Sequence, residues 1–313
     1  DSAPKGILLW RALLQWLGGI GVIVMAITIL PFLGVGGMQL FQIESATASE
    51  KILPKTKEIS FKIFYIYFSL TFLCFLFYYL AGMNVFDAVA HSMTTIATGG
   101  FSTHNESIGF FKNPLIEIIS IIFIVLGSLP FITYLKFVMG EKKIFLLDSQ
   151  IRGFLFLILI SILVMFLYLV VNQDLSLLKN LRIASFNVVS ILSGTGYVTS
   201  DFSLWGNFPL IFFLVLMFIG GCAGSTACGI KIFRIQILLA FFKTQIKKII
   251  YPNGIFPIRY NNNKIEPAFI SSVITFIYLY FLIFFIIIVL LTLNGMDFVS
   301  SILCKIFPTT ILE

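Results

Sequence analysis

Two segments of the chain combine glycine with small hydroxyl side chains in a pattern that could bind a cation. Residues His91–Thr103 and Asn187–Thr199 lie 96 residues apart, and each runs from a short apolar stretch into Thr, Ser and Gly and then an aromatic residue. Their centres are called loop A (Ala97–Phe101) and loop B (Ser193–Tyr197). A glycine in each loop permits backbone angles that other residues resist, so carbonyl oxygens can turn toward one axis and replace an ion's hydration shell.

The candidate cation-binding residues are therefore the members of the two loops: Ala97, Thr98, Gly99, Gly100, Phe101, Ser193, Gly194, Thr195, Gly196 and Tyr197. Thr98, Ser193 and Thr195 can add hydroxyl oxygens. A short helix before each loop would direct its partly negative C-terminal end at the same point, which favours a cation over an anion. The alternative is a pair of loops that only pack, but two loops in register favour a pore.

The composition indicates what must position these loops. Hydrophobic residues make up 59% of the 313 residues and charged residues 11%, too few for the surface of a soluble globule of this length. We therefore expect an all-α integral membrane protein. Six apolar runs are long enough to cross a bilayer: residues 7–33, 60–82, 115–139, 152–172, 208–242 and 267–293.

The basic residues indicate the orientation of these spans. Of the 21 Lys and Arg residues, 15 fall on the connections 38–59, 140–151 and 243–266 or the helix ends beside them. Positive loops stay on the cytoplasmic side, so residues 83–114 and 173–207 are expected outside. The net charge of +7 is thus a topology signal, and we do not expect nucleic acid as a partner.

Each outer connection contains an apolar stretch too short to span, followed by loop A or loop B. Irregular backbone at membrane depth is tolerated where it lines a water-filled path or is buried in protein. We therefore predict re-entrant segments in a repeated unit of helix, half-helix with loop, and helix. A third unit starts at 267–293 and continues into Met296–Val299, and the run 7–33 closes a unit whose beginning is absent.

The run 208–242 is far longer than a bilayer requires, and its middle should break. The glycine-rich break consists of Gly220, Gly221, Cys222, Ala223, Gly224, Ser225, Thr226, Ala227, Cys228 and Gly229. One interpretation is helix packing through the GxxxG pair Gly220 and Gly224. The other is an intramembrane gate below the loops. Lys231 is expected to snorkel toward the membrane surface rather than to tune ion passage.

Other residues support weaker predictions. Gly18, Gly19 and Gly21 are expected to permit close helix packing. His91 and His104 have no metal-ligand partners in the sequence, and His91 is expected to pack behind loop A. Glu117 is expected near the outer interface, where water can reach it. The cysteines at 74, 222, 228 and 304 have no CxxC spacing and are interpreted as packing residues.

Loops A and B, together with Trp10–Gly21 and Gly220–Lys231, resemble the Trk/Ktr/HKT superfamily of potassium transporters, and the Trk potassium-uptake membrane subunit in particular. The resemblance covers nearly the whole chain. It implies four membrane-pore-membrane repeats around one pore, with Gly100 and Gly196 as filter glycines, K⁺ as the transported ion and no other cofactor. It also supports the gate interpretation, although Cys228 stands where the family usually has glycine.

The resemblance further implies a multi-pass protein of the bacterial inner membrane, a homodimer surrounded by lipid and a cytosolic nucleotide-binding regulatory subunit. The basic segment 243–266 could dock an acidic face of that regulator, although positive-inside topology explains the same residues. The division along the chain would be as follows: residues 1–54 as the closing helix of repeat 1 and a cytoplasmic loop, 55–147 as repeat 2, 148–250 as repeat 3 with the broken helix, and 251–313 as the opening of repeat 4.

Two alternatives to selective potassium uptake remain open. An ion-coupled secondary transporter also uses broken helices at its site, but the paired outer loops favour a pore. A truncated, non-conducting remnant is the other, because no glycine stands near position 310, where a fourth filter is expected. The sequence looks truncated at both ends, and with two of four loops we expect this chain alone not to conduct. Since no nucleophile with a base, Walker motif or carboxylate pair is present, we do not expect an enzyme.

Overall fold

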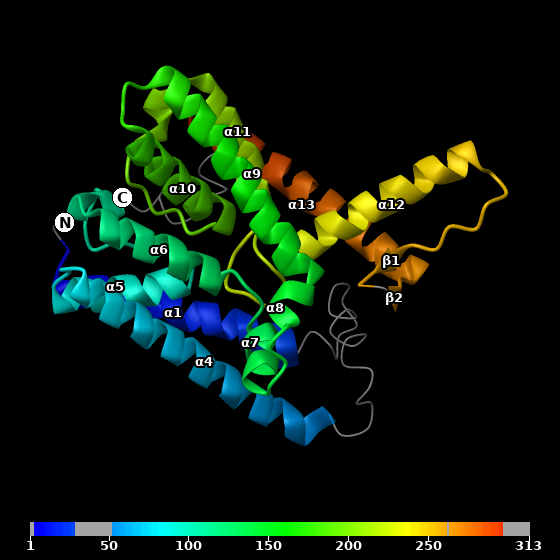
Figure 1. Cartoon of the computed structure of the whole chain (residues 1–313), viewed down its shortest axis with the longest axis horizontal. Coiled ribbons are helices and arrows are strands. Elements are labelled where there is room, and N and C mark those ends of the chain that lie inside the picture. Colours follow the sequence, from blue (N-terminus) through cyan, green and yellow to red (C-terminus); the bar gives the residue numbers. More distant parts are fainter. Residues whose placement is uncertain (1–2, 29–51, 262, 297–313) are drawn as a thin grey trace.

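The computed structural model describes residues 3–28, 52–261 and 263–296, and the predicted all-α fold is confirmed. Helices form the whole architecture apart from one two-stranded hairpin (Figure 1). The elements are α1 (Lys5–Thr28), α4 (Ile52–Leu80), α5 (Val85–Ile96), η1 (Ser107–Phe111), α6 (Pro114–Gly127), α7 (Phe131–Val138), α8 (Ile144–Leu147), α9 (Ser149–Asn172), α10 (Leu177–Ser193), η2 (Phe202–Trp205), α11 (Asn207–Phe218), α12 (Ile232–Ile250), β1 (Arg259–Tyr260), β2 (Asn263–Lys264) and α13 (Pro267–Leu293).

Within the described part of the chain, three helices are long and apolar enough to cross a membrane by themselves: residues Glu58–Leu80 of α4, α9 and α13. At most 28% of each of these spans is buried inside the protein. Apolar side chains therefore cover their outer surfaces, where lipid or another apolar surface must meet them. The predicted run 7–33 is helical as α1 up to Thr28, and the remainder of that run lies outside the described residues.

The predicted re-entrant segments are two short helices, α5 and α10. The Asn84 side chain caps α5 by accepting a hydrogen bond from the Asp87 amide at 2.8 Å. The longer α10 ends at Gly194, which adopts the left-handed conformation with φ +75°. In Figure 1, α5 lies beside α1 and α4, whereas α10 lies beside α6 and α9. Each of the two helices thus packs against neighbouring helices, as a non-spanning segment must.

The predicted span 115–139 is apolar enough to cross a membrane only as a bent pair of helices, α6 and α7. The chain turns by 86° between α6 and α7, at residues 128–130. Pro130 lacks an amide hydrogen and restricts the residue before it, so the helix cannot continue through this point. The carbonyls freed at the end of α6 find other partners, which are described with the candidate site below.

Several predictions concern residues that the structure does not describe. These are most of the proposed continuation of the third unit at 297–299, the expected fourth filter near 310, Cys304 and most of the connection 38–59.

The three glycines of α1 are not equivalent, which corrects part of the packing prediction. A Cβ atom on Gly18 or Gly21 would meet nothing within 4 Å. A Cβ atom on Gly19 would lie 2.8 Å from the Tyr67 hydroxyl and 3.2 Å from the Cβ of Ala97. That hydroxyl donates to the Trp16 carbonyl at 2.9 Å. Gly19 is therefore the position where α1 packs tightly against both α4 and loop A.

Replacing Gly19 with alanine should lower the free energy of unfolding by about 1–3 kcal/mol, because the added methyl group overpacks this contact. The measurement is thermal unfolding of the purified protein in detergent, with Gly18→Ala as the matched control. Similar melting temperatures for both variants would contradict the assignment of the tight contact to Gly19.

Candidate functional site

Loops A and B have the same backbone conformation at positions 96 residues apart. Thr98 and Gly194 both have positive φ values, +47° and +75°. Gly100 and Gly196 share a φ of +84°. A positive φ is strained for a β-branched residue such as Thr98, so the surrounding structure must hold it in place.

Hydrogen bonds repeat at the same offset. In loop A the Gly99 N–H donates to the Thr94 carbonyl at 2.8 Å, and the Thr94 hydroxyl donates to the Phe101 carbonyl at 2.9 Å. The corresponding bonds of loop B run from the Thr195 N–H to the Ser190 carbonyl at 2.9 Å and from the Ser190 hydroxyl to the Tyr197 carbonyl at 2.7 Å. In each case the last turn of the short helix binds the middle residue and the last residue of the loop. The two loops are thus built by the same local interactions from different side chains.

The two loops also meet in space. A Cβ atom on Gly100 would overlap the carbonyl oxygen of Thr195, so only glycine permits this approach. The hydroxyls of the loops are engaged with neighbours: Ser193 with Thr195 at 2.6 Å, and Thr98 with Thr226 at 3.2 Å. These hydroxyls are buried and serve first to hold the loops together.

A buried hydroxyl cluster joins loop B to the helix before loop A. The Tyr197 hydroxyl contacts the Thr94 hydroxyl and lies 3.3 Å from that of Thr95. Thr95 in turn contacts the hydroxyl of Tyr78 on α4 at 2.9 Å, and Tyr78 contacts Ser120 on α6 at 2.8 Å. Tyr197, predicted as part of loop B, therefore also supports loop A. Tyr78 and Ser120 were not predicted from the sequence.

The predicted break in the run 208–242 is confirmed as a non-helical segment between α11 and α12. The helical packing interpretation of Gly220 and Gly224 is wrong, because neither glycine is in a helix. Gly220 instead donates to the Ile230 carbonyl at 2.9 Å, and a Cβ atom there would overlap the Cys228 carbonyl oxygen. The segment doubles back on itself, which requires glycine at its closest contact.

The glycine-rich break caps the C-terminal ends of three helices. The Thr226 hydroxyl lies 2.9 Å from the carbonyls of both Ile96, the last residue of α5, and Gly127, the last residue of α6. The Cys228 amide donates to the carbonyl of Ser193, the last residue of α10, at 3.3 Å. The break therefore lies directly against the ends of both short helices.

The break and the α6–α7 turn also satisfy each other's backbone. The Cys222 amide donates to the Ser128 carbonyl at 3.1 Å, and the Phe131 amide donates to the Gly224 carbonyl at 2.9 Å. The Ala223 amide is bound by the Gln150 side chain of α9 at 3.0 Å. Two interrupted spans thus supply each other's missing hydrogen bonds.

Two residues near the break differ from their predicted roles. The ammonium of Lys231 donates to the Ala227 carbonyl inside the break, so it does not snorkel away from it. Cys74 and Cys222 are buried as expected, whereas Cys228 is exposed and is not a core residue.

Two polar residues of α1 contact loop A, and sequence reasoning missed both. The side-chain amide of Gln15 donates to the Gly99 backbone carbonyl at 2.9 Å and accepts from the Phe101 backbone N–H at 3.2 Å. The Arg11 guanidinium lies 4.1 Å from the centre of the Phe101 ring, a cation–π contact. Their spacing of four residues along one helix face, and their place in the segment Trp10–Gly21 that carries the family resemblance, were the signals in the sequence.

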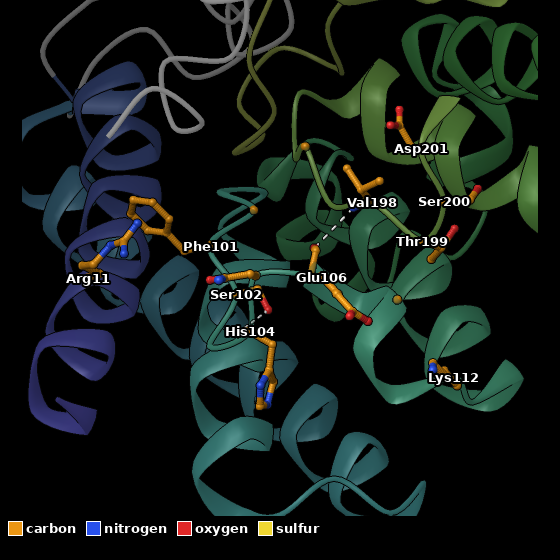
Figure 2. Close-up of a pocket in the computed structure, with 15 residues that line it drawn as sticks. Arg11, Phe101, Ser102, His104, Glu106, Lys112, Val198, Thr199, Ser200 and Asp201 are labelled. Carbon is orange, nitrogen blue, oxygen red and sulfur yellow. Dashed lines mark hydrogen bonds between the residues drawn. The ribbon is translucent and has the colours of Figure 1, made fainter. Parts of the chain in front are cut away.

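A pocket of about 640 Å³ opens beside both loops (Figure 2). Gly100, Phe101 and Gly196 contribute to its lining from the loops. Its charged and titratable side chains are Arg11, His104, Glu106, Lys112 and Asp201. Figure 2 shows Arg11 against Phe101 on one side and Asp201 on the other. The loops thus face a wide, polar compartment.

His91 is buried behind loop A, as expected. Its ring nitrogens contact the Asp87 carbonyl at 2.8 Å and the Ser102 hydroxyl at 2.9 Å, and burial lowers its pKa to about 4. The ring is therefore neutral at physiological pH. Burial raises the pKa of the Asp87 carboxyl, but hydrogen bonds from Thr103 and His104 outweigh burial and hold that pKa below its usual value.

Among the described residues, no group of three or more His, Cys, Asp and Glu side chains could hold a metal ion.

The prediction that Glu117 lies close to water is wrong. Glu117 is 7% exposed, and its carboxylate lies 2.9 Å from the Nε of Arg182 on α10. This ion pair connects α6 to the helix that carries loop B. Removing Arg182 would leave the Glu117 carboxylate buried without its partner, which is costly.

These features define a multi-pass integral membrane protein in which short re-entrant helices and two broken spans enclose a pair of matched loops. The TrkH family, described as cation transport proteins, matches residues 1–307 of the chain.

Named relatives agree with this assignment. The Trk system potassium uptake protein TrkI of Halomonas elongata is 40% identical over 302 residues, covering 96% of this chain and 61% of that protein. The Trk system potassium uptake protein TrkH of Vibrio parahaemolyticus is 36% identical over 307 residues, covering 96% of this chain and 63% of that protein. The crystal structure of the potassium transporter TrkH from Vibrio parahaemolyticus matches with a TM-score of 0.89 at 35% identity, covering 98% of this chain and 64% of that chain.

The chain belongs to the TrkH family. The relatives are transporters and not enzymes. The chain spans less than two thirds of the length of these relatives.

Replacing Tyr197 with phenylalanine should lower the free energy of unfolding by about 1–3 kcal/mol, because buried hydroxyls of Thr94 and Thr95 lose a partner. Thermal unfolding in detergent measures the effect. The control is Tyr79→Phe, since Tyr79 is 50% exposed. An equal, small effect of both substitutions would mean that the hydroxyl cluster does not support the loops.

Proposed function

We propose that the chain forms part of a potassium-uptake pore, in which loops A and B are selectivity-filter segments and the glycine-rich break is a gate. The matched backbone of the two loops carries the proposal. Glycines with the same φ of +84° stand where the loops meet, at the C-terminal ends of two short helices. Carbonyl oxygens and helix ends together provide the negative potential that a dehydrated cation needs.

Potassium is proposed as the ion because the relatives are named as Trk system potassium uptake proteins. No cofactor other than the transported K⁺ is included in the proposal. The relatives do not favour an ion-coupled secondary transporter of another class. The bacterial inner membrane is the proposed location, since the related proteins come from bacteria and the spans are apolar.

The proposed organisation follows the repeated units. Residues 1–54 close one unit, 55–147 and 148–250 form two units that each carry one loop, and 251–313 open a further unit. The helix orders α4–α5–α6 and α9–α10–α11 support the two central units, because in each a spanning helix is followed by the helix before the loop and then by another apolar helix.

The proposed partners are a second copy of the protein and a cytosolic nucleotide-binding regulatory subunit. The names of the relatives place them in a Trk system, which fits a membrane subunit working with other components. Lys243, Lys247, Lys248 and Arg259 are exposed at and beyond the end of α12 and could meet an acidic surface. Positive-inside topology accounts for the same residues and is the competing explanation.

The filter proposal predicts that Gly196→Ser in the intact protein lowers K⁺/Na⁺ discrimination, because serine resists a φ of +84° and the carbonyls must reorient. Ion uptake into proteoliposomes measures the ratio. Gly82→Ser is the control, since Gly82 also has positive φ, +102°, but nothing lies within 4 Å of its Cβ position. Unchanged discrimination in a normally folded Gly196→Ser protein would refute the proposal.

The gate proposal predicts that Thr226→Val raises ion flux severalfold while leaving K⁺/Na⁺ discrimination intact. Valine cannot donate to the carbonyls of Ile96 and Gly127, so the break loses its side-chain contact with the ends of α5 and α6. The backbone bond from the Thr226 amide to the Gly127 carbonyl remains, so the break is loosened rather than detached. Thr244→Val is the matched control, because the Thr244 hydroxyl bonds to the Ala240 carbonyl within α12. If Thr226→Val leaves the flux at its original level, the break only packs against the helices.

A further inference from the structure

One face of α1 follows loop A along its whole length. Arg11, Gln15 and Gly19 are four residues apart and so lie above one another on the helix. Arg11 meets the Phe101 ring, and Gly19 meets Ala97 at the other end of the loop. Gln15 stands between these contacts.

Gln15 binds the backbone of loop A on both sides of Gly100. Its amide nitrogen donates to the carbonyl of Gly99, and its amide oxygen accepts from the N–H of Phe101. A Cβ atom on Gly99 would overlap the Gln15 amide, so the absence of a side chain at 99 allows this contact. Gly100 is therefore fixed between two anchored backbone groups.

Only an amide side chain of this length provides both interactions. A glutamate has the same shape but cannot donate, and its carboxylate would face the Gly99 carbonyl oxygen. A leucine fills the space but leaves both backbone groups without a partner. Because selectivity depends on the number and field strength of the carbonyl oxygens around an ion, the orientation of this backbone matters directly.

We propose that Gln15 is a positioning residue that determines the ion selectivity of loop A from outside the loop. This inference rests on the proposed function of loop A as a filter segment. Gln15 acts through the backbone at Gly99 and Phe101, and the contacts of Arg11 and Gly19 keep α1 at the distance that its side chain requires. The closing helix of one unit, α1, thus fixes the backbone orientation of the filter segment in the next unit.

The test compares K⁺ and Na⁺ uptake by the intact protein in proteoliposomes for Gln15→Glu and Gln15→Leu. The expected result is a drop of about fivefold or more in the K⁺/Na⁺ uptake ratio, the size expected from one neutral hydrogen bond. Gly100→Ser tests the filter role of loop A in the same assay. Gly18→Ala, one position from Gly19 with open space around it, is the control that should keep the original ratio.

The outcomes separate the two proposals. If Gly100→Ser loses discrimination while both Gln15 variants keep it, the inference about Gln15 is wrong and the filter proposal stands. If all three variants keep discrimination, both fail. If the Gln15 variants take up less K⁺ and less Na⁺ but keep the K⁺/Na⁺ uptake ratio, Gln15 has only a structural role and the inference is overturned. If the Gln15→Leu protein does not accumulate, the K⁺/Na⁺ uptake ratio of the isosteric Gln15→Glu variant decides between these outcomes.

Discussion

The structure depends on one constraint: backbone groups at membrane depth must find hydrogen-bond partners within the protein. The helix α6 and the two short helices α5 and α10 end there, and the glycine-rich break supplies partners to all three. Its Thr226 hydroxyl reaches α5 and α6, and its Cys228 amide reaches α10. The irregular segment is thus a shared cap for three helix ends, and its Cys222 and Ala223 amides are bound by the α6–α7 turn and Gln150.

This sharing links the break to loops A and B mechanically. Loop A begins one residue after the Ile96 carbonyl, and loop B begins at Ser193, whose carbonyl the break also binds. Any displacement of the break removes partners from these helix ends at once, and each unpaired group is costly where water is excluded. A gate in this position would therefore move only if water or new protein contacts replaced the lost bonds. The two proposed functional elements cannot be energetically independent.

The sequence predicted the features that depend on local composition. The short helices, the two loops and the break at Gly220–Gly229 follow from glycine placement and from the length of apolar runs. The turn after α6 was missed because the run 115–139 is apolar enough overall to read as one span, and its local signals are confined to Gly127, Ser128 and Pro130. The contacts of Gln15 and Thr226 could not be predicted, because they join residues 84 and 130 positions apart through helix packing.

The two loops also differ in an informative way. Their backbone conformations match, and each is closed by a hydroxyl from its own short helix. The residues that bind the two loops from elsewhere in the chain differ. The side chain of Gln15 on α1 binds the backbone of loop A, whereas the Cys228 amide donates to the Ser193 carbonyl at the start of loop B. Similar backbone conformations reached through different supporting contacts indicate that the fold maintains the backbone geometry rather than any one side chain. A cation bound by carbonyl oxygens would require the same backbone geometry in both loops, because it interacts with the oxygens and not with the side chains of the residues that carry them.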